Sequence, residues 1–170
     1  MSPDEDAVER RVGARLAERG ETVATAESIT GGLIASRLTD VPGASTYVDR
    51  GFVTYAYEAK TGTLGVDRAL LDTHGAVSEP VAERMASAAR DLAGTDWGVG
   101  ITGIAGPTGG SKEKPVGTTY IGVAYAGAWG THESFTVVTS HRFDGDRSTI
   151  KSAAADAALD ALLTHIENRQ

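Results

Sequence analysis

The sequence alternates between two hydrophobic periods, and this alternation restricts the possible fold more than any other feature. Near the start, Val8, Val12 and Leu16 recur every four positions and Gly20 follows them. That spacing is typical of a helix with one buried face that ends at a glycine. Residues 21–27 then form a short apolar-leaning segment that is expected to be a strand.

The same alternation continues to the end of the chain. Two strand-like segments lie close together before the last helical pattern, with the sequence Gly-Ala-Trp-Gly between them, which predicts a hairpin. An early alternation of helices and strands followed by a hairpin favours a layered α/β fold with a mixed sheet. We predict helices over residues 31–39, 58–75 (broken), 79–93 and 147–166, and strands over 46–57, 96–103, 118–126 and 131–139.

Three of the predicted helices begin with capping signals. Ser2 is followed by Pro3 and Glu5, which together predict a capping box with proline in the first turn. Ser78 and Asp146 precede the helices over residues 79–93 and 147–166 and are expected to be their N-caps.

Composition narrows the class of protein. The 170 residues fit a single domain, 1–170, with 41% hydrophobic residues and a formal net charge of -7. This acidic balance argues against a nucleic-acid-binding protein, and no segment has the signature of a signal sequence or a membrane span. The absence of cysteine excludes disulfides and a thiolate nucleophile, and is compatible with the cytoplasmic location that we expect.

The segment Thr-Ala-Glu-Ser-Ile-Thr-Gly-Gly joins a predicted strand to a predicted helix. It concentrates Glu27, Ser28, Thr30, Gly31 and Gly32 at one turn. Such a turn exposes backbone N–H groups that bind phosphate or stabilise an oxyanion, and it makes Ser28 a candidate nucleophile. The residues alone leave open whether Ser28 or Thr30 merely caps the helix.

Histidine and lysine are the two residue types that could act as a base for Ser28. The four histidines lie outside glycine-rich turns, which argues against a serine–histidine–acid triad. Tyr55 and Lys60 lie five positions apart, and a desolvated lysine can serve as the base. An ordinary solvated lysine remains the alternative.

Two further segments have the composition of ligand-binding loops. Residues 100–110 contain five glycines, but lack the spacing of a P-loop or of a dinucleotide fingerprint. Arg142 and Arg147 near the last helix could clamp a phosphate. A serine-x-x-lysine pattern from Ser148 to Lys151 and a lysine-threonine-glycine pattern at residues 60–62 suggest a β-lactamase-like site. The two occur in reversed order and the serine-aspartate-asparagine element is absent, which argues against it. No histidine or carboxylate spacing predicts a metal site.

Five segments together resemble one family. They are AESITGG, GFVTYAYEAKTGTLGV, GAVSEPVAERMA, GITGIAGPTGG and KPVGTTYIGVA, and they occur in the family's order from about Leu16 to the last helix. They resemble the CinA C-terminal domain, the family that contains the nicotinamide mononucleotide amidohydrolase PncC. The resemblance implies a compact three-layer α/β/α domain in a stand-alone form, without the molybdopterin-binding-related domain that many relatives carry.

The resemblance also implies a site and a reaction. The family's serine, tyrosine and lysine correspond to Ser28, Tyr55 and Lys60, its threonine to Thr102, and an arginine to Arg147 rather than Arg142. The expected reaction is the deamidation of nicotinamide mononucleotide to nicotinic acid mononucleotide and ammonia, without a cofactor or metal. In that reaction Ser28 is the nucleophile and Lys60 the base, and Tyr55 relays the proton.

The remaining expected roles concern substrate binding. Thr30 or Thr102 is expected to hold the oxyanion with the backbone of the Gly31–Gly32 turn, and Glu27 to orient Lys60 or bind a ribose hydroxyl. The loop containing Gly103 and Gly106 is expected to hold the nucleotide with Arg147. We expect a small-molecule nucleotide as ligand and a homo-oligomer as the assembly. The alternative is a non-catalytic module that binds a pyridine nucleotide or an ADP-ribose-like ligand.

Overall fold

The protein is a mixed five-stranded sheet covered by helices on both faces. The computed structural model describes residues 6–169, so the predicted capping box at Ser2 lies outside the described residues. The strand order is β2-β1-β3-β4-β5. β1 pairs in parallel with both β2 and β3, whereas β4 pairs antiparallel with β3 and β5, which confirms the predicted mixed sheet. The strands are β1 (Val23–Glu27), β2 (Val48–Val53), β3 (Trp97–Gly103), β4 (Thr118–Tyr125) and β5 (Phe135–Arg142).

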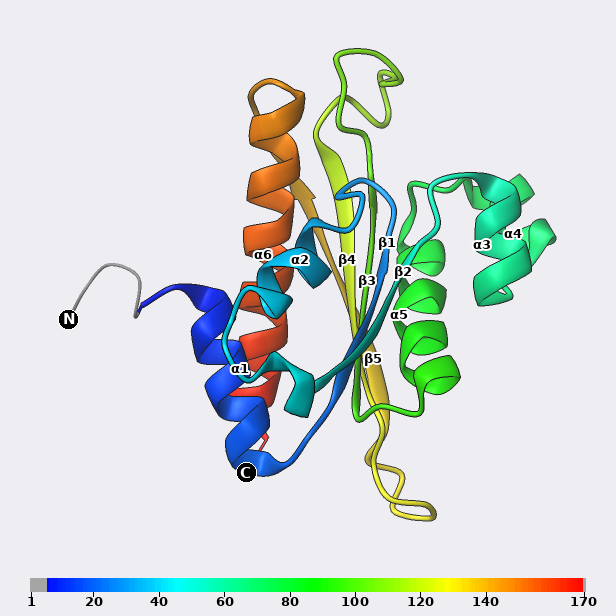
Figure 1. Cartoon of the computed structure of the whole chain (residues 1–170). Helices are drawn as coiled ribbons and strands as arrows, with labels where there is room; N and C mark the ends of the chain where they lie inside the picture. The colour runs from blue at the N-terminus through cyan, green and yellow to red at the C-terminus, as the bar shows by residue number, and fades with distance from the viewer. Residues whose placement is uncertain (1–5, 170) are drawn as a thin grey trace.

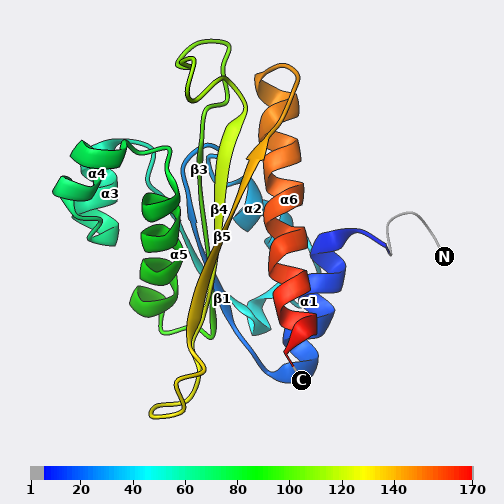
Figure 2. The ribbon, with the colours of Figure 1, turned by 180° about the vertical axis from the view of Figure 1, so that it is seen from behind.

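Two helical layers enclose this sheet, as Figures 1 and 2 show from opposite sides. One layer consists of α1 (Val8–Arg19), α2 (Leu33–Thr39) and α6 (Arg147–Asn168). The other is formed by α5 (Glu79–Ala93), with α3 (Tyr57–Leu64) and α4 (Arg68–His74) beside its N-terminal end. A separate cluster of buried apolar side chains lies on each face of the sheet, so the predicted three-layer α/β/α sandwich is confirmed.

Glycines in the central strands let α5 pack closely against the sheet. A side-chain carbon at Gly98 or Gly100 of β3 would overlap the backbone of Ala86. One at Gly122 of β4 would lie 2.6 Å from the carbonyl oxygen of Ala82. This close packing fixes the position of α5 on the sheet, including the end of α5 that lies nearest the carboxyl ends of the parallel strands.

The structure corrects several predicted boundaries. The strand predicted over residues 46–57 ends at Val53, and Tyr57 already belongs to α3. Tyr55 and Tyr57 favour a strand by propensity, but they lie beyond Glu27 and Val53, the last residue pair of β1 and β2, where β1 offers no further pairing. The strand predicted over 131–139 begins at Phe135, because the preceding residues form a turn in which Thr131 N–H donates to the Ala128 carbonyl.

Other predictions of helix limits are confirmed. The helix predicted to be broken over residues 58–75 divides into α3 and α4, with Gly65 in the left-handed conformation at the end of α3. α6 begins after Asp146, whose side chain accepts a hydrogen bond from the N–H of Thr149. Ser78 occupies the N-cap position of α5, but its hydroxyl donates to the carbonyl of Gly75 instead of capping the helix.

The sheet topology determines where a ligand can bind. β1 lies between β2 and β3 and is parallel to both, so the carboxyl ends of these three strands lie at the same end of the sheet. A crevice forms in open α/β sheets at such a point, outside the carboxyl ends of the strands. Residues 28–32, 54–56 and 104–117 follow the three strands, and they include most of the predicted site. Within residues 6–169 no helix has both the length and the apolar character that crossing a membrane requires.

Candidate active site

Ser28 is held rigidly at the carboxyl end of the central parallel strand. Every residue of β1 is buried, and the N–H of Ser28 donates to the carbonyl of Ile101 in β3 at 3.1 Å. The chain then turns sharply through Gly31 and Gly32, which both have positive φ. Gly31 N–H closes this turn by donating to the Ser28 carbonyl at 3.1 Å. The Ser28 side chain therefore lies at a fixed position, and the residue is 8% exposed.

Lys60 approaches Ser28 from the opposite side of the crevice. It belongs to the first turn of α3, and its Nζ lies 2.9 Å from Ser28 Oγ. The same amine donates to the carbonyl oxygens of Thr54 at 2.7 Å and Tyr55 at 3.2 Å. Lys60 is only 1% exposed, which excludes the alternative of a solvated surface lysine.

The environment of Lys60 favours its neutral form. Burial lowers the pKa of Lys60 from 10.5 to about 8, because the charged amine loses hydration. In the described part of the chain, no carboxylate forms an ion pair with this amine, so an opposing effect on the pKa is lacking. About one molecule in ten therefore has a neutral Lys60 at pH 7.

Glu27 has a role that differs from both of those left open by the sequence. Its fully buried carboxylate accepts from the N–H groups of Ile34 at 2.8 Å and Ala35 at 3.0 Å, in the first turn of α2. It also accepts from the Thr30 hydroxyl at 2.6 Å. Neither oxygen contacts Lys60, and neither is accessible to a ribose hydroxyl. Glu27 thus anchors α2 and the turn that positions Ser28.

The side chain of Tyr55 forms part of the wall of the site and makes no hydrogen bond to either member of the reactive pair, Ser28 and Lys60. The residue is 61% exposed, and its hydroxyl accepts a hydrogen bond from Arg147 at 2.9 Å. The backbone carbonyl of Tyr55, and not its phenol, contacts the Lys60 amine. The predicted proton relay through the phenol therefore lacks the required hydrogen bond in this structure.

Arg147 lies at the same edge of the sheet, at the first position of α6. Its guanidinium donates to the Tyr55 hydroxyl and, at 2.7 Å, to the carbonyl of Gly106 in the glycine-rich loop. Arg142 instead ends β5, where it pairs with Thr118. Of the two arginines considered from the sequence, Arg147 is the one in contact with the site residues.

The hydroxyls of Thr30 and Thr102 are already used in hydrogen bonds. Thr30 donates to Glu27, and Thr102 donates to the carbonyl of Ala76 at 2.8 Å. These two donors are therefore not free to stabilise an oxyanion, contrary to the sequence-based expectation. Over residues 6–169, the backbone N–H groups of Ile29 and Thr30 have no hydrogen-bond acceptor, so the turn itself supplies the available donors.

A pocket of about 190 Å³ opens onto the reactive pair. Much of its wall could not be predicted from the sequence, because small apolar residues such as Ala76, Val77 and Ala105 have no distinctive signature. Gly103 is needed here, since a side-chain carbon at this position would lie 2.8 Å from Ile29 Cδ1. The pocket is lined by Ser28, Ile29, Tyr55, Lys60, Ala76, Val77, Thr102, Gly103 and Ala105.

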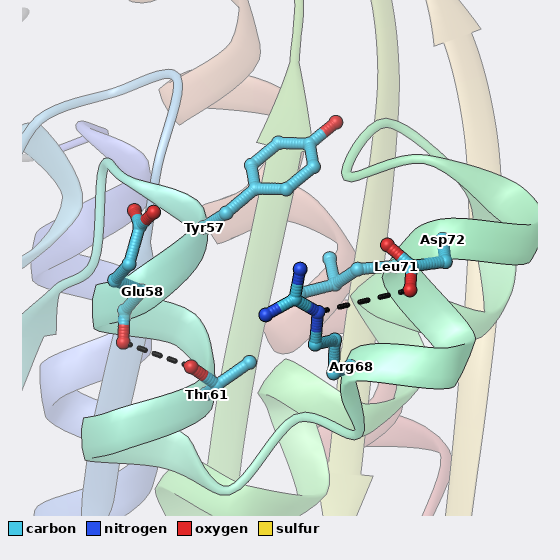
Figure 3. A pocket seen from close by; sticks show the side chains of 6 residues that line it. All are labelled: Tyr57, Glu58, Thr61, Arg68, Leu71 and Asp72. Atoms are coloured by element: carbon cyan, nitrogen blue, oxygen red, sulfur yellow. Dashed lines mark hydrogen bonds and ion pairs between the residues drawn. The ribbon is translucent and has the colours of Figure 1, made fainter.

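A smaller pocket of about 110 Å³ lies between α3 and α4 (Figure 3). Its polar groups largely bond within the two helices: Arg68 pairs with Asp72 at 3.8 Å, and Thr61 donates to the carbonyl of Glu58. Tyr57 connects the two pockets, because its hydroxyl accepts from the N–H of Ala76. Among the described residues no group of three histidine, aspartate or glutamate side chains could hold a metal ion.

Comparisons with known proteins assign the chain to a family. The sequence profile of the CinA C-terminal domain matches residues 5–166. A CinA-like protein from Anaeromyxobacter dehalogenans is 55% identical over 151 residues, which is 89% of this chain but only 35% of that protein. The chain thus spans about a third of the length of the curated relatives that it matches.

Solved structures cover the chain more completely. The competence/damage inducible protein CihA from Agrobacterium tumefaciens superposes with a TM-score of 0.89 and 38% identity, over 99% of this chain and 98% of that one. The competence damage-inducible protein A from Klebsiella pneumoniae gives 0.88 and 33%, over 96% and 97%. The profile match covers nearly the whole sequence, and the fold agrees. The chain therefore belongs to the CinA family, as a CinA C-terminal domain.

Proposed function

We propose that the chain is an amidohydrolase that converts nicotinamide mononucleotide to nicotinic acid mononucleotide and ammonia. The observation that carries the proposal is the 2.9 Å contact between Lys60 Nζ and Ser28 Oγ, two groups that belong to buried residues. A serine hydroxyl needs a neighbouring base to become a nucleophile, and this amine is within hydrogen-bond reach. Family membership supports the proposal, through the resemblance to the nicotinamide mononucleotide amidohydrolases of the same family.

The hydrogen bonds of Lys60 suit a base. A neutral amine has two hydrogens and one lone pair. The two hydrogens can go to the carbonyls of Thr54 and Tyr55, which leaves the lone pair for the hydroxyl hydrogen of Ser28. The carbonyls thereby orient the amine, and the pKa of about 8 keeps the neutral form accessible near neutral pH.

The reaction then proceeds in two halves. Ser28 Oγ attacks the carboxamide carbon while Lys60 accepts the hydroxyl proton, and the N–H groups of Ile29 and Thr30 stabilise the oxyanion. Each such donor lowers the barrier by about 3 kcal/mol. Lys60 returns the proton to the leaving nitrogen, so that ammonia departs and an ester on Ser28 remains. Water, deprotonated by Lys60, cleaves this ester to give the acid and the free serine.

The size of the pocket supports a nucleotide bound partly outside it. A volume of about 190 Å³ is below the roughly 300–1,000 Å³ of pockets that enclose drug-sized ligands. We propose that the pocket accepts the carboxamide-bearing ring and that ribose and phosphate extend toward Arg147 and the loop of Gly103 and Gly106. The exposed Tyr55 side chain forms the boundary between these two regions.

Release of ammonia from nicotinamide mononucleotide tests the proposal. We expect steady turnover by the unaltered protein and a loss of at least about 10³-fold in Ser28→Ala, which lacks the nucleophile. Ser45→Ala, which removes an exposed serine hydroxyl from another part of the surface, is the matched control and should keep full activity. Binding of the nucleotide without ammonia release would contradict the proposal and favour a non-catalytic binding module.

A further inference from the structure

A second cation lies beside Arg147 on α6. Lys151 follows Arg147 by four residues, which places both on the same face of the helix. The Lys151 side chain reaches the turn after Ser28: a side-chain carbon at Gly31 would lie 3.6 Å from Lys151 Nζ. Arg147 reaches the other boundary of the site, at Tyr55 and Gly106. The two cations thus lie over neighbouring parts of one site.

Neither cation is neutralised by the protein. In the part of the chain that the structure describes, neither Arg147 nor Lys151 forms an ion pair with a carboxylate. Arg37, elsewhere on the same helical layer, contrasts with them because it pairs with both Glu9 and Asp156. Besides Lys60, the region around the Ser28 turn therefore has two positive charges without a fixed counter-ion, in a protein whose formal net charge is -7.

Helix dipoles cannot replace these side chains. The first-turn N–H groups of α2 at Ile34 and Ala35 already bind the Glu27 carboxylate. The first turn of α6 is capped by the Asp146 carboxylate, which accepts from Thr149 N–H. Both helix ends are thus occupied by negative charge from the protein. An anionic ligand at this edge of the sheet must be balanced mainly by side-chain cations.

We infer that Lys151 is a specificity-determining residue that binds, together with Arg147, the phosphate of a phosphomonoester ligand. The inference rests on the proposed function and deepens it by assigning the charge that selects nucleotides over nucleosides. A phosphomonoester has a charge of about -1.5 to -2 at pH 7. Arg147 alone balances one half to two thirds of this charge, whereas the guanidinium and the ammonium together balance all of it.

Calorimetric titration tests this assignment without requiring turnover. The protein has Ser28→Ala in every sample, and the probes are nicotinamide mononucleotide and its phosphate-free counterpart, nicotinamide riboside. Lys151→Met should weaken binding of the nucleotide by about 10- to 100-fold, as expected for losing a hydrogen bond to a charged group. Its effect on the riboside should be less than about twofold. Lys151→Arg should retain most of the preference for the nucleotide.

Arg11→Met is the matched control, because it removes an equal positive charge from an exposed position on α1, outside the proposed site. It should change neither affinity appreciably. Equal losses for nucleotide and riboside in Lys151→Met, or an unchanged nucleotide affinity, would overturn the inference. So would a Ser28→Ala protein that does not bind nicotinamide mononucleotide.

The two proposals can fail separately. An unaltered protein that binds nicotinamide mononucleotide through Lys151 but releases no ammonia would refute the amidohydrolase proposal and support the phosphate site. An active protein whose nucleotide affinity is unaffected by Lys151→Met would support the reaction and refute the role of Lys151.

Discussion

Two buried ionisable side chains, on either side of Ser28, show how differently a protein can hold a charge. Glu27 precedes Ser28 in the chain and has no exposed surface, and its two oxygens accept from backbone and hydroxyl donors of the α2 turn. Lys60 reaches Ser28 from α3 and is equally buried, but its partners are a hydroxyl and two carbonyls.

The difference lies in what each set of partners does to the charged form. Hydrogen-bond donors around Glu27 compensate the carboxylate for lost hydration, so this residue stabilises the fold. The neutral acceptors around Lys60 compensate less, and burial lowers its pKa to about 8. Burial of a charge is thus a poor guide to function by itself. The structural carboxylate of Glu27 differs from the candidate base Lys60 in how fully hydrogen bonds replace the hydration that the charged group loses on burial.

Replacing Lys60 by methionine should have the largest effect and tests the base directly. We expect the rate of ammonia release to fall by about 10³-fold or more, because Ser28 loses its proton acceptor. The fold should persist, since methionine is apolar and of similar length. The measurement is kcat for nicotinamide mononucleotide together with circular dichroism of the variant. A rate within tenfold of the unaltered protein would contradict the assignment of Lys60.

The same variant should reveal the cost of burying the amine. The unfolded chain has Lys60 with a pKa near 10.5 and the folded protein has it at about 8, so only the unfolded state binds the proton between these values. Stability of the unaltered protein should therefore rise with pH across this window, by about 3 kcal/mol relative to Lys60→Met. Below pH 8 the free energy of unfolding is lowered by the full cost of burying the Lys60 amine. Urea unfolding of both proteins at pH 7.5 and 10 measures this cost. An equal difference in the free energy of unfolding between the two proteins at both pH values would contradict a lowered pKa.

Glu27→Gln tests the second of the two buried ionisable side chains. Glutamine keeps the shape but replaces one acceptor oxygen by a donor NH₂ group, so an α2 N–H or the Thr30 hydroxyl loses its partner. We expect a loss of about 2 kcal/mol in the free energy of unfolding, measured in urea. The exposed Glu83→Gln in α5 is the control and should change stability little. A stable but inactive Glu27→Gln would indicate a direct part in the reaction.

Tyr55→Phe should have the smallest effect. The substitution removes a hydroxyl that contacts Arg147, and it leaves the carbonyl contact to Lys60 unchanged. We expect kcat for ammonia release to change by less than about fivefold, whereas loss of a true proton relay costs about 10²- to 10⁴-fold. A loss of that size would restore the relay and place part of the base function outside Lys60.

The sequence predicts the periodic parts of this molecule well. Val8, Val12 and Leu16 correctly locate one face of α1, and Asp146 correctly marks the start of α6. Prediction fails where tertiary contacts outweigh local propensity. Residues 54–57 have the composition of a strand, but β2 ends at Val53 and Tyr57 already begins α3, the helix that carries Lys60.

The candidate site is less accessible to sequence reasoning than the fold. Ser28 and Lys60 are 32 residues apart, and the residues alone leave Lys60 either a base or a solvated surface lysine. The resemblance to a family assigns it as the base, and the structure places it beside Ser28. The anchoring role of Glu27 depends on backbone N–H groups seven and eight residues later, which have no side-chain signature. In the sequence, Lys151 is conspicuous only as part of a serine-x-x-lysine pattern that points to a different kind of site. Its relation to this site depends on the packing of α6 near Gly31.

The dependence of kcat/KM on pH tests the central claim most directly. If neutral Lys60 is the base in the free enzyme, the rate of ammonia release should rise with pH and level off above an inflection near 8, where the amine loses its proton. Phosphate ionisation near pH 6 lies well below this inflection. A profile that is flat between pH 7 and 9, or one that falls as pH rises through 8, would contradict the account.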